Sequence, residues 1–135
     1  MSEFTIGISA ALPEQAGMHY QDGYKVALQA HPNVHTFYMP QPAEGQVGLA
    51  IAPQDIAEFD GVLALSPTFS ADSFSGQYRL AVIGRWGVGY DRINVEACTR
   101  AGVLLAIATE AVRTPVAEAV VALLLALAKC CLLYT

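Results

Sequence analysis

The chain has 135 residues, of which 54% are hydrophobic and only 14% are charged, and its formal net charge at pH 7 is −5. This length allows one domain with a sizeable core, and so apolar a composition suggests surface that something else covers. The negative charge and the scattered Lys and Arg residues argue against nucleic acid and against a membrane surface as partners.

The first half of the chain alternates short apolar runs with helical stretches. A strand is predicted over residues 4–9 and a helix over residues 14–30. A second strand, over residues 34–38, is rich in β-branched and aromatic residues. A loop containing proline and glycine follows over residues 40–48, and a short helix over residues 53–58 has a proline near its first turn.

Two further strands follow in the middle of the chain. The third is predicted over residues 61–65 and runs into a Ser-Pro-Thr turn at residues 66–68. The fourth covers residues 80–84 and is apolar throughout, as expected for a central strand of a parallel sheet.

A capped helix and a fifth strand complete the alternation. Asn94 is a plausible N-cap for a helix that runs to Arg100, and Gly102 ends it. The strand covers residues 103–107. Strands that alternate with helices through short loops predict an α/β fold with a doubly wound parallel sheet.

The last predicted helix has Thr114 as its cap, Pro115 at its first position and residues 116–127 as its body. Glu118 and Lys129 interrupt its apolar stretch, and the remaining core is far shorter than the ~20 residues that a membrane span needs. We therefore expect a buried helix and no membrane partner.

The cysteines and histidines predict no metal site. Cys98, Cys130 and Cys131 form neither a disulfide framework nor a CxxC pair, and Pro32 prevents two of the histidines from sharing a helical face. The N-terminus lacks the basic start and the long apolar stretch of a signal peptide. We expect a cytoplasmic protein with reduced thiols.

The most informative segment is the glycine-bearing turn after the fourth strand. Gly87 and Gly89 could let backbone N–H groups face a small anion, or they could simply serve a tight turn; the spacing leaves both open. The segment imitates the GxGxxG nucleotide loop, but Arg92 stands where its third glycine should be. Arg85 is interpreted equally well as a cation of the cleft or as an ion-pair partner, whereas Trp86 is interpreted as a packing or cleft-wall aromatic rather than a stacking platform.

A resemblance to a known family rests on residues 80–91, with the sequence Leu-Ala-Val-Ile-Gly-Arg-Trp-Gly-Val-Gly-Tyr-Asp. It continues through residues 93–97, residues 101–103 and the Pro-Val-Ala-Glu of residues 115–118, and it covers residues 58–129. Over this stretch the chain resembles the D-isomer-specific 2-hydroxyacid dehydrogenases.

The resemblance implies two similar α/β domains, of which the second carries GxGxxG and binds NAD or NADP. Residues 1–110 would then form the flavodoxin-like substrate domain, and residues 111–135 the crossing helix and the start of the cofactor domain. A small 2-hydroxy or 2-keto acid is the implied substrate, and the full-length enzyme is implied to be a homodimer.

The resemblance also assigns site residues. The backbone amides of the turn would hold the substrate carboxylate, and two side chains of the Ser-Pro-Thr turn would line the same cleft. Two residues at the start of the crossing helix would lie near the nicotinamide. The implied substrate-binding residues are Ser66, Thr68, Gly87, Val88 and Gly89, and the implied cofactor-binding residues are Val116 and Glu118.

Three departures point to a divergent subfamily. Leu65 stands where many members carry an Arg that pairs with substrate anions, which weakens the expectation of a doubly charged substrate. Ala119 replaces a frequent His, and residues 107–110 replace the usual Asn-Thr-Pro.

Hydride transfer also needs a cofactor, an Arg that polarises the carbonyl and a His–Glu pair that supplies the proton, all of which the family places in the second domain. We expect a fragment that stops before that domain, assign it no catalytic residue and expect it to be inactive alone. The alternative is a non-enzymatic, flavodoxin-like module that binds an anion or has a regulatory role.

Overall fold

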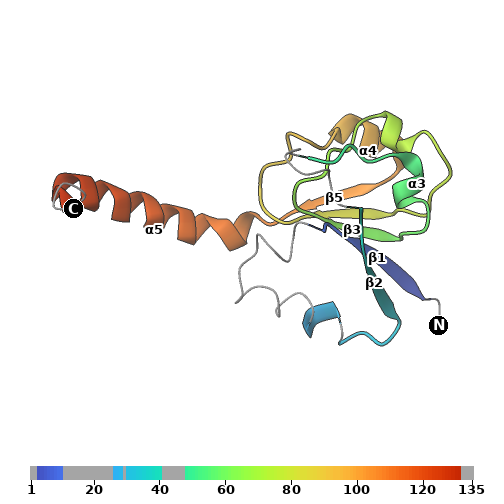
Figure 1. The fold of residues 1–135 in the computed structure, drawn as a ribbon, viewed down its shortest axis with the longest axis horizontal. Coiled ribbons are helices and arrows are strands. Elements are labelled where there is room, and N and C mark those ends of the chain that lie inside the picture. The colour runs from blue at the N-terminus through green and yellow to red at the C-terminus, as the bar shows by residue number, and fades with distance from the viewer. Residues whose placement is uncertain (1–2, 11–25, 29, 41–47, 132–135) are drawn as a thin grey trace.

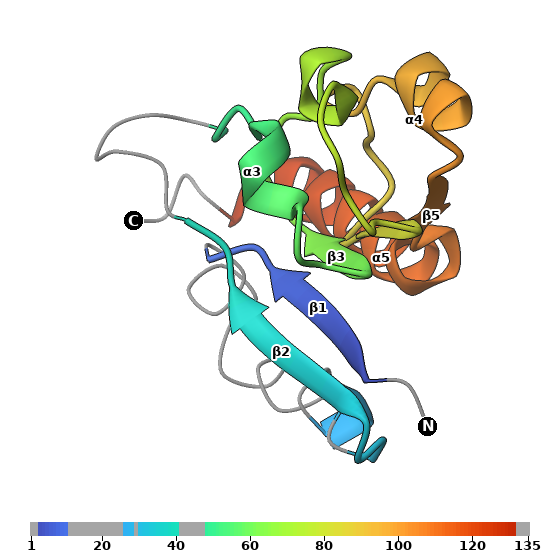
Figure 2. The ribbon, with the colours of Figure 1, turned by 90° about the vertical axis from the view of Figure 1, so that its right-hand side faces the viewer.

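The computed structural model describes residues 3–10, 26–28, 30–40 and 48–131. Within them, five strands form one parallel sheet in the order β2-β1-β3-β4-β5. Figures 1 and 2 show the sheet, with β1, β2, β3 and β5 labelled. The strands are β1 (Phe4–Ile8), β2 (Val34–Tyr38), β3 (Gly61–Ala64), β4 (Val82–Arg85) and β5 (Leu104–Ile107). The order is that of flavodoxin-like sheets, so the predicted α/β fold is confirmed.

The main core lies between the sheet and the elements on one face. These elements are α3 (Pro53–Ile56), a 3₁₀ turn (Asp72–Phe74) and α4 (Val95–Ala101), seen above the sheet in Figure 1. Ile56, Phe69 and Ile83 are almost completely buried there. Continuous apolar strands such as β3 and β4 belong in a parallel sheet because both of their faces pack against other elements.

The other face of the sheet carries a smaller apolar cluster centred on Ile8. Leu28, Leu63 and Trp86 pack against it, which agrees with the packing role expected for the tryptophan. The predicted helix over residues 14–30 lies mostly outside the described residues, and of it only residues 26–28 are seen as helical.

Local signals at the ends of α4 are as predicted. The Asn94 side chain accepts a hydrogen bond from the Ala97 N–H at 2.9 Å. Gly102 ends the helix in the left-handed conformation, with a φ of 71°. A polar side chain that satisfies a free N–H, and a residue without a Cβ where φ is positive, explain both boundaries.

The predicted start of the last helix is wrong. Helix α5 runs over Thr109–Ala128, so Thr114 is not its cap and Pro115 lies inside it. A proline inside a helix removes its own N–H from the hydrogen-bond ladder, and its ring crowds the carbonyl four residues earlier. The turn before it forms nonetheless, and an Arg113–Glu110 ion pair of 3.1 Å accompanies it there.

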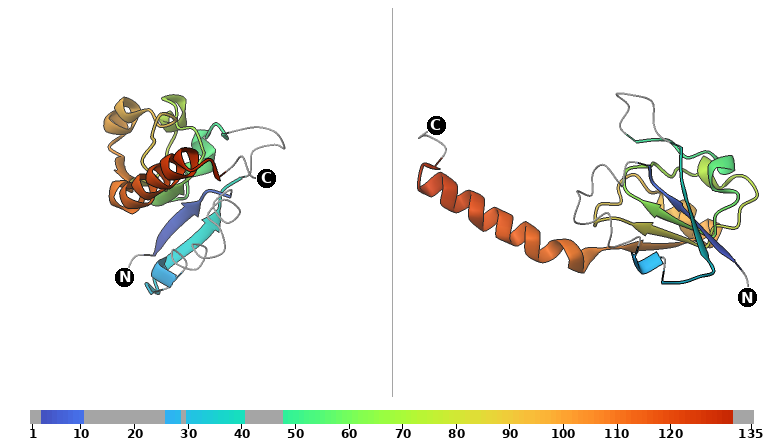
Figure 3. Two further views of the ribbon diagram at one scale, coloured as in Figure 1. Left: turned by 90° about the vertical axis from the view of Figure 1, so that its left-hand side faces the viewer. Right: turned by 60° about the horizontal axis from the view of Figure 1, so that its bottom comes forward.

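The predicted burial of this helix is also wrong. None of α5 is buried against the described residues, and Figures 1 and 3 show it leaving the sheet as a projecting rod. Its apolar side chains lie on all sides, a pattern typical of a helix that other elements surround, and no described residue covers it. By length and composition alone α5 could also cross a membrane, which is a weak indication.

The amino ends of three strands meet at Asp60. Its carboxylate accepts a hydrogen bond from the Thr5 N–H at 2.8 Å and pairs with Arg79, whose Nη2 lies 2.5 Å from Oδ2. Its own backbone bonds to Thr5 and to Ala81. The hydrogen bond from Arg79 lowers the pKa of Asp60 below its usual value.

The lowered pKa of Asp60 makes the stability of the fold depend on pH. The stabilisation is complete above the unfolded-state value of about 3.9 and is lost as the pH falls through the lower folded-state value. We predict that Asp60→Asn removes this part of the acid dependence, measured by urea unfolding at several pH values below neutral. Asp72→Asn, at an exposed aspartate, is the control. An unchanged acid slope in Asp60→Asn would contradict the prediction.

Exposed leucines on α5 predict association of the chain. Leu123 and Leu127, which are 63% and 68% exposed, lie one turn apart on the same side of the helix. We expect the molar mass from light scattering to rise with concentration, and to rise less in Leu123→Gln/Leu127→Gln. Leu104→Gln, at an equally exposed leucine on β5, is the control. A monomer at every concentration would overturn this expectation.

Candidate functional site

The candidate site lies where β3 and β4 end. The two strands pair in parallel with Ala64 opposite Arg85, and the Trp86 N–H continues the ladder by donating to the Ala64 carbonyl at 2.8 Å. The turns after the two strands therefore lie side by side. Between them is a pocket of about 310 Å³, lined by Leu65, Ser66, Pro67, Arg85, Gly89, Tyr90, Asp91, Arg92 and Ile93.

Two backbone N–H groups in the second turn have no acceptor among the described residues. Gly87 has a φ of 131°, its N–H donates to the Arg85 carbonyl and its carbonyl accepts from Ala108. By contrast, the N–H groups of Val88 and Gly89 donate to no acceptor among the described residues. Gly87 thus serves the turn, and Val88 and Gly89 are left with donors for an anion.

Arg85 braces this turn and also lines the pocket. Its Nε donates to the Gly89 carbonyl at 2.7 Å, and its Nη1 donates to the Trp86 carbonyl. Burial lowers the pKa of Arg85, and the neighbouring charge of Arg92 lowers it further. Arg85 forms no ion pair with a described residue, so of the two interpretations the structure favours the cleft cation.

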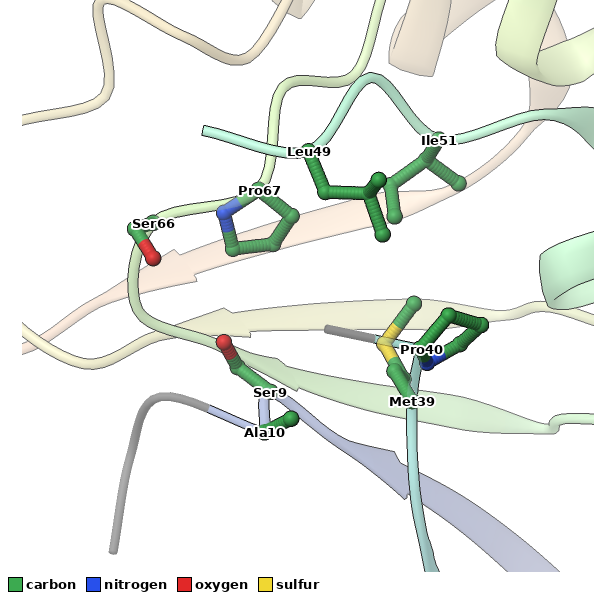
Figure 4. A pocket seen from close by; sticks show the side chains of 8 residues that line it. All are labelled: Ser9, Ala10, Met39, Pro40, Leu49, Ile51, Ser66 and Pro67. Atoms are coloured by element: carbon green, nitrogen blue, oxygen red, sulfur yellow. The ribbon is translucent and has the colours of Figure 1, made fainter. Parts of the chain in front are cut away.

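Ser66 lies between this pocket and a second, smaller hollow at the ends of β1 and β2. Figure 4 shows the side-chain oxygens of Ser66 and Ser9 pointing into the gap between their two turns. The hollow measures about 10 Å³, which is room for a single water molecule. It is too small for a substrate, although it lies at the β1/β3 switch point of the sheet.

Thr68 is not brought to the pocket. Its N–H donates to the Leu49 carbonyl at 2.7 Å and its carbonyl accepts from Ile51, so it fixes the loop behind the Ser-Pro-Thr turn. Val116 and Glu118 are exposed on α5, away from the pocket. Ala108, the residue before that helix, is joined to the turn by the hydrogen bond from its N–H to the Gly87 carbonyl at 2.9 Å.

Sequence reasoning missed Arg92 as a residue of the site. It treated this arginine only as a defect in a nucleotide loop, but Arg92 lines the pocket, and a Cβ at Gly48 would collide with its Nη1. Helix α4 starts later, after Asn94, so no helix begins at the two glycines. The position of a cation in the turn after a central strand was the available signal.

Residues 26–130 match a family model described as the D-isomer specific 2-hydroxyacid dehydrogenase, catalytic domain. The chain belongs to this family. The match extends the resemblance, noted above for residues 58–129, back to residue 26, and it includes both turns of the pocket.

A solved structure supports the same fold. The chain is similar to NAD⁺-bound 3-phosphoglycerate dehydrogenase of Entamoeba histolytica, with a TM-score of 0.57 and 20% identity over 77% of the chain. The chain spans only 32% of the length of that dehydrogenase. At this identity the likeness extends to the fold alone. No curated protein sequence matches the chain.

The two glycines of the turn should differ in their tolerance of a side chain. Gly87→Ala places a Cβ at a φ of 131°, which side chains rarely adopt, and we expect a loss of about 1–3 kcal/mol in unfolding free energy. In the matched variant Gly89→Ala, the Cβ meets only Asp91, at an ordinary 3.5 Å, so the loss should be smaller. Urea unfolding measures both, and equal losses would contradict this account.

Proposed function

We propose that this chain forms the substrate-binding part of an NAD- or NADP-dependent 2-hydroxyacid dehydrogenase. Residues 1–110 would be the substrate domain, and residues 111–135 the crossing helix that leads into the cofactor domain. Family membership and the fold support this assignment. The observation that carries it is the pair of N–H groups at Val88 and Gly89, which donate to no acceptor among the described residues; Gly89 lines the pocket and Val88 directly precedes it.

These N–H groups would hold the carboxylate of a small 2-hydroxy or 2-keto acid. Two adjacent amide donors suit the two oxygens of a carboxylate, and charge-assisted hydrogen bonds of this kind are strong. Arg85 keeps the turn in shape through the Gly89 carbonyl, so little order has to be gained on binding. Ser66 would add a hydroxyl at the edge of the pocket, and Gly87 would shape the turn.

The dinucleotide does not fit the described residues of this chain. The glycine turn does not lead directly into a helix, and the third glycine of the nucleotide loop is replaced by Arg92. In the proposal, NAD or NADP is held by the second domain that the family resemblance implies, and it supplies the hydride there. The contribution of this chain is to bind and orient the acid, without a catalytic residue of its own.

The remaining assignments follow the same proposal. The enzyme would act in the cytoplasm as a homodimer, and Val116 and Glu118 would approach the nicotinamide end once a cofactor domain packs beside α5. The competing function is an anion-binding or regulatory module without enzymatic activity, because the same N–H groups would serve it equally well.

Binding of pyruvate to the chain tests the proposed function. We expect saturable NMR shifts of the Val88 and Gly89 amides with a millimolar dissociation constant, as befits so small a ligand. Pyruvamide, which lacks the carboxylate, is the control and should leave these amides unchanged. We also expect the chain alone to show no oxidation of NADH by pyruvate.

Two results would contradict the proposal. If pyruvate shifts neither amide, the carboxylate seat is wrong. If acetate and sulfate bind as tightly as pyruvate at the same amides, a general anion module becomes the better account.

A further inference from the structure

We propose that two copies of this chain pair reciprocally, with one side of α5 of each copy lying in an apolar groove on the sheet of the other. The groove is on the face of the sheet opposite the main core, and it shares no lining residue with the pocket of the candidate site. The inference does not depend on the proposed substrate. It goes beyond the association expected from exposed leucines, because it assigns the surface that those leucines contact.

The groove, called the sheet groove below, runs across the three central strands. In the register of the sheet, Ile6 of β1 lies beside Gly61 of β3, and Gly61 lies beside Val82 of β4. Two residues further along, Leu63 lies beside Gly84. The two glycines among larger side chains leave a hollow of about 270 Å³, and no residue that lines it is charged. Glycines inside strands often mark a place where another segment approaches the sheet closely.

The face that carries the sheet groove is less covered than the other face. The strands of a parallel sheet normally bury both faces. Val62 and Ile83, which point to the main core, are buried, whereas Leu63 and Val82, on the groove side, are only partly buried. The described residues outside the strands that line the groove are Ala27, Leu28 and Trp86. The sheet groove therefore has room for a further apolar element.

Helix α5 carries a row of side chains that suits this groove. Val120, Leu123 and Leu127 recur at intervals of three and four residues, so they lie on one side of the helix, and each is more than half exposed. With about 3.6 residues per turn, the charged Glu118 lies on the opposite side. This row, called the α5 row below, is therefore uncharged like the groove.

In the described conformation, α5 does not cover the groove of its own chain. The hydrogen bond from the Ala108 N–H to the Gly87 carbonyl holds the start of the helix at the carboxyl ends of the strands. From there the helix projects away from the sheet, as Figures 1 and 3 show. Its 20 residues make it about 30 Å long, which is enough to reach across a neighbouring molecule. The exchange of identical elements between two copies is a low-cost route to a symmetric dimer.

The accessible surface of the chain is as large as such a pair requires. A compact monomer of 14.3 kDa would expose about 6,800 Å². This chain exposes 9103 Å², which is about a third more. The excess is larger than the ~800 Å² that each partner contributes to a standard protein interface. Reciprocal pairing would bury it in two equal helix–groove contacts.

Other occupants would leave one of the two surfaces open. A lipid bilayer around α5 would leave the sheet groove exposed, and a small apolar ligand in the groove would leave α5 exposed. A second copy covers both surfaces with one kind of contact. The side of α5 that carries Glu118 stays free, so the pairing is compatible with the proposed cofactor domain beside this helix.

Cross-linking between two cysteine variants locates the contact. Cys130 and Cys131, which are exposed, are first replaced by serine, while the buried Cys98 is kept. Chains with Gly84→Cys in the groove and chains with Leu123→Cys in the α5 row, carrying different affinity tags, are mixed and treated with a short bismaleimide. We expect the mixed product to dominate over links between identical chains. With Glu118→Cys in place of Leu123→Cys, on the opposite side of α5, the mixed product should be lost.

Two variants that leave the net charge unchanged measure the strength of the contact. Gly84→Val fills the groove, and its Cβ meets Leu63 and Val62 at ordinary distances of 3.7 and 3.8 Å, so the strand accommodates it. We expect the dissociation constant of the dimer, from sedimentation equilibrium, to rise about tenfold. The control Phe37→Gln removes an exposed aromatic on the other face of the sheet, beside Gly7, and should change it less than about twofold. Circular dichroism of both variants checks that they fold.

Four results would overturn the inference. The chain could remain monomeric at every concentration. Chains with Leu123→Cys could link to one another and not to Gly84→Cys, in which case the helices pair with each other. Folded Gly84→Val could dimerise as tightly as the unchanged chain, which would leave the groove without a role. The chain could bind vesicles of neutral phosphatidylcholine while Gly84→Cys stays unlinked, and the partner of α5 would then be a membrane.

Discussion

The site depends on one interaction, the in-register parallel pairing of β3 with β4. With Ala64 opposite Arg85, the strands end together, and every residue that lines the pocket lies at the end of β4 or in one of the two turns. A shift of one residue would exchange the inward and outward faces of a strand. Ile83, which is completely buried in the core, would then be turned away from it, so packing of the core fixes the register and thereby the pocket.

The charged side chains at the two ends of the strands differ in their partners. At the amino ends of the strands, the Asp60 carboxylate accepts a hydrogen bond from the Thr5 N–H and forms an ion pair with Arg79. At the carboxyl ends, Arg85 is satisfied only by backbone carbonyls, and Arg92 has no carboxylate partner among the described residues. A carboxylate that is paired inside the protein stabilises the fold, whereas a guanidinium without a carboxylate partner retains donors for charge-assisted hydrogen bonds to an anionic ligand. The carboxyl ends of the strands are therefore where we place the candidate site.

Prediction from the sequence succeeded where the signal was local and failed where it required a partner in space. The five apolar runs gave the five described strands, and Asn94 and Gly102 marked the ends of α4 because each acts on its own backbone. Pro115 misled because proline is tolerated both at a first position and, at a cost, inside a helix. The exposure of α5 and the position of Arg92 at the pocket were missed because each depends on which segments lie beside it.

Hydrogen bonds on both backbone groups of Gly87 fix the turn that carries the N–H groups of Val88 and Gly89. The Gly87 N–H donates to the Arg85 carbonyl, and the Gly87 carbonyl accepts from the Ala108 N–H. The Arg85 side chain also donates to the Gly89 carbonyl. The two amides between these anchors are thereby oriented before any ligand arrives, which lowers the entropic cost of binding. The bond to Ala108 also joins the turn to the residue before α5. A partner that packs on α5 would thus act on a helix joined directly to the turn that forms the proposed carboxylate seat.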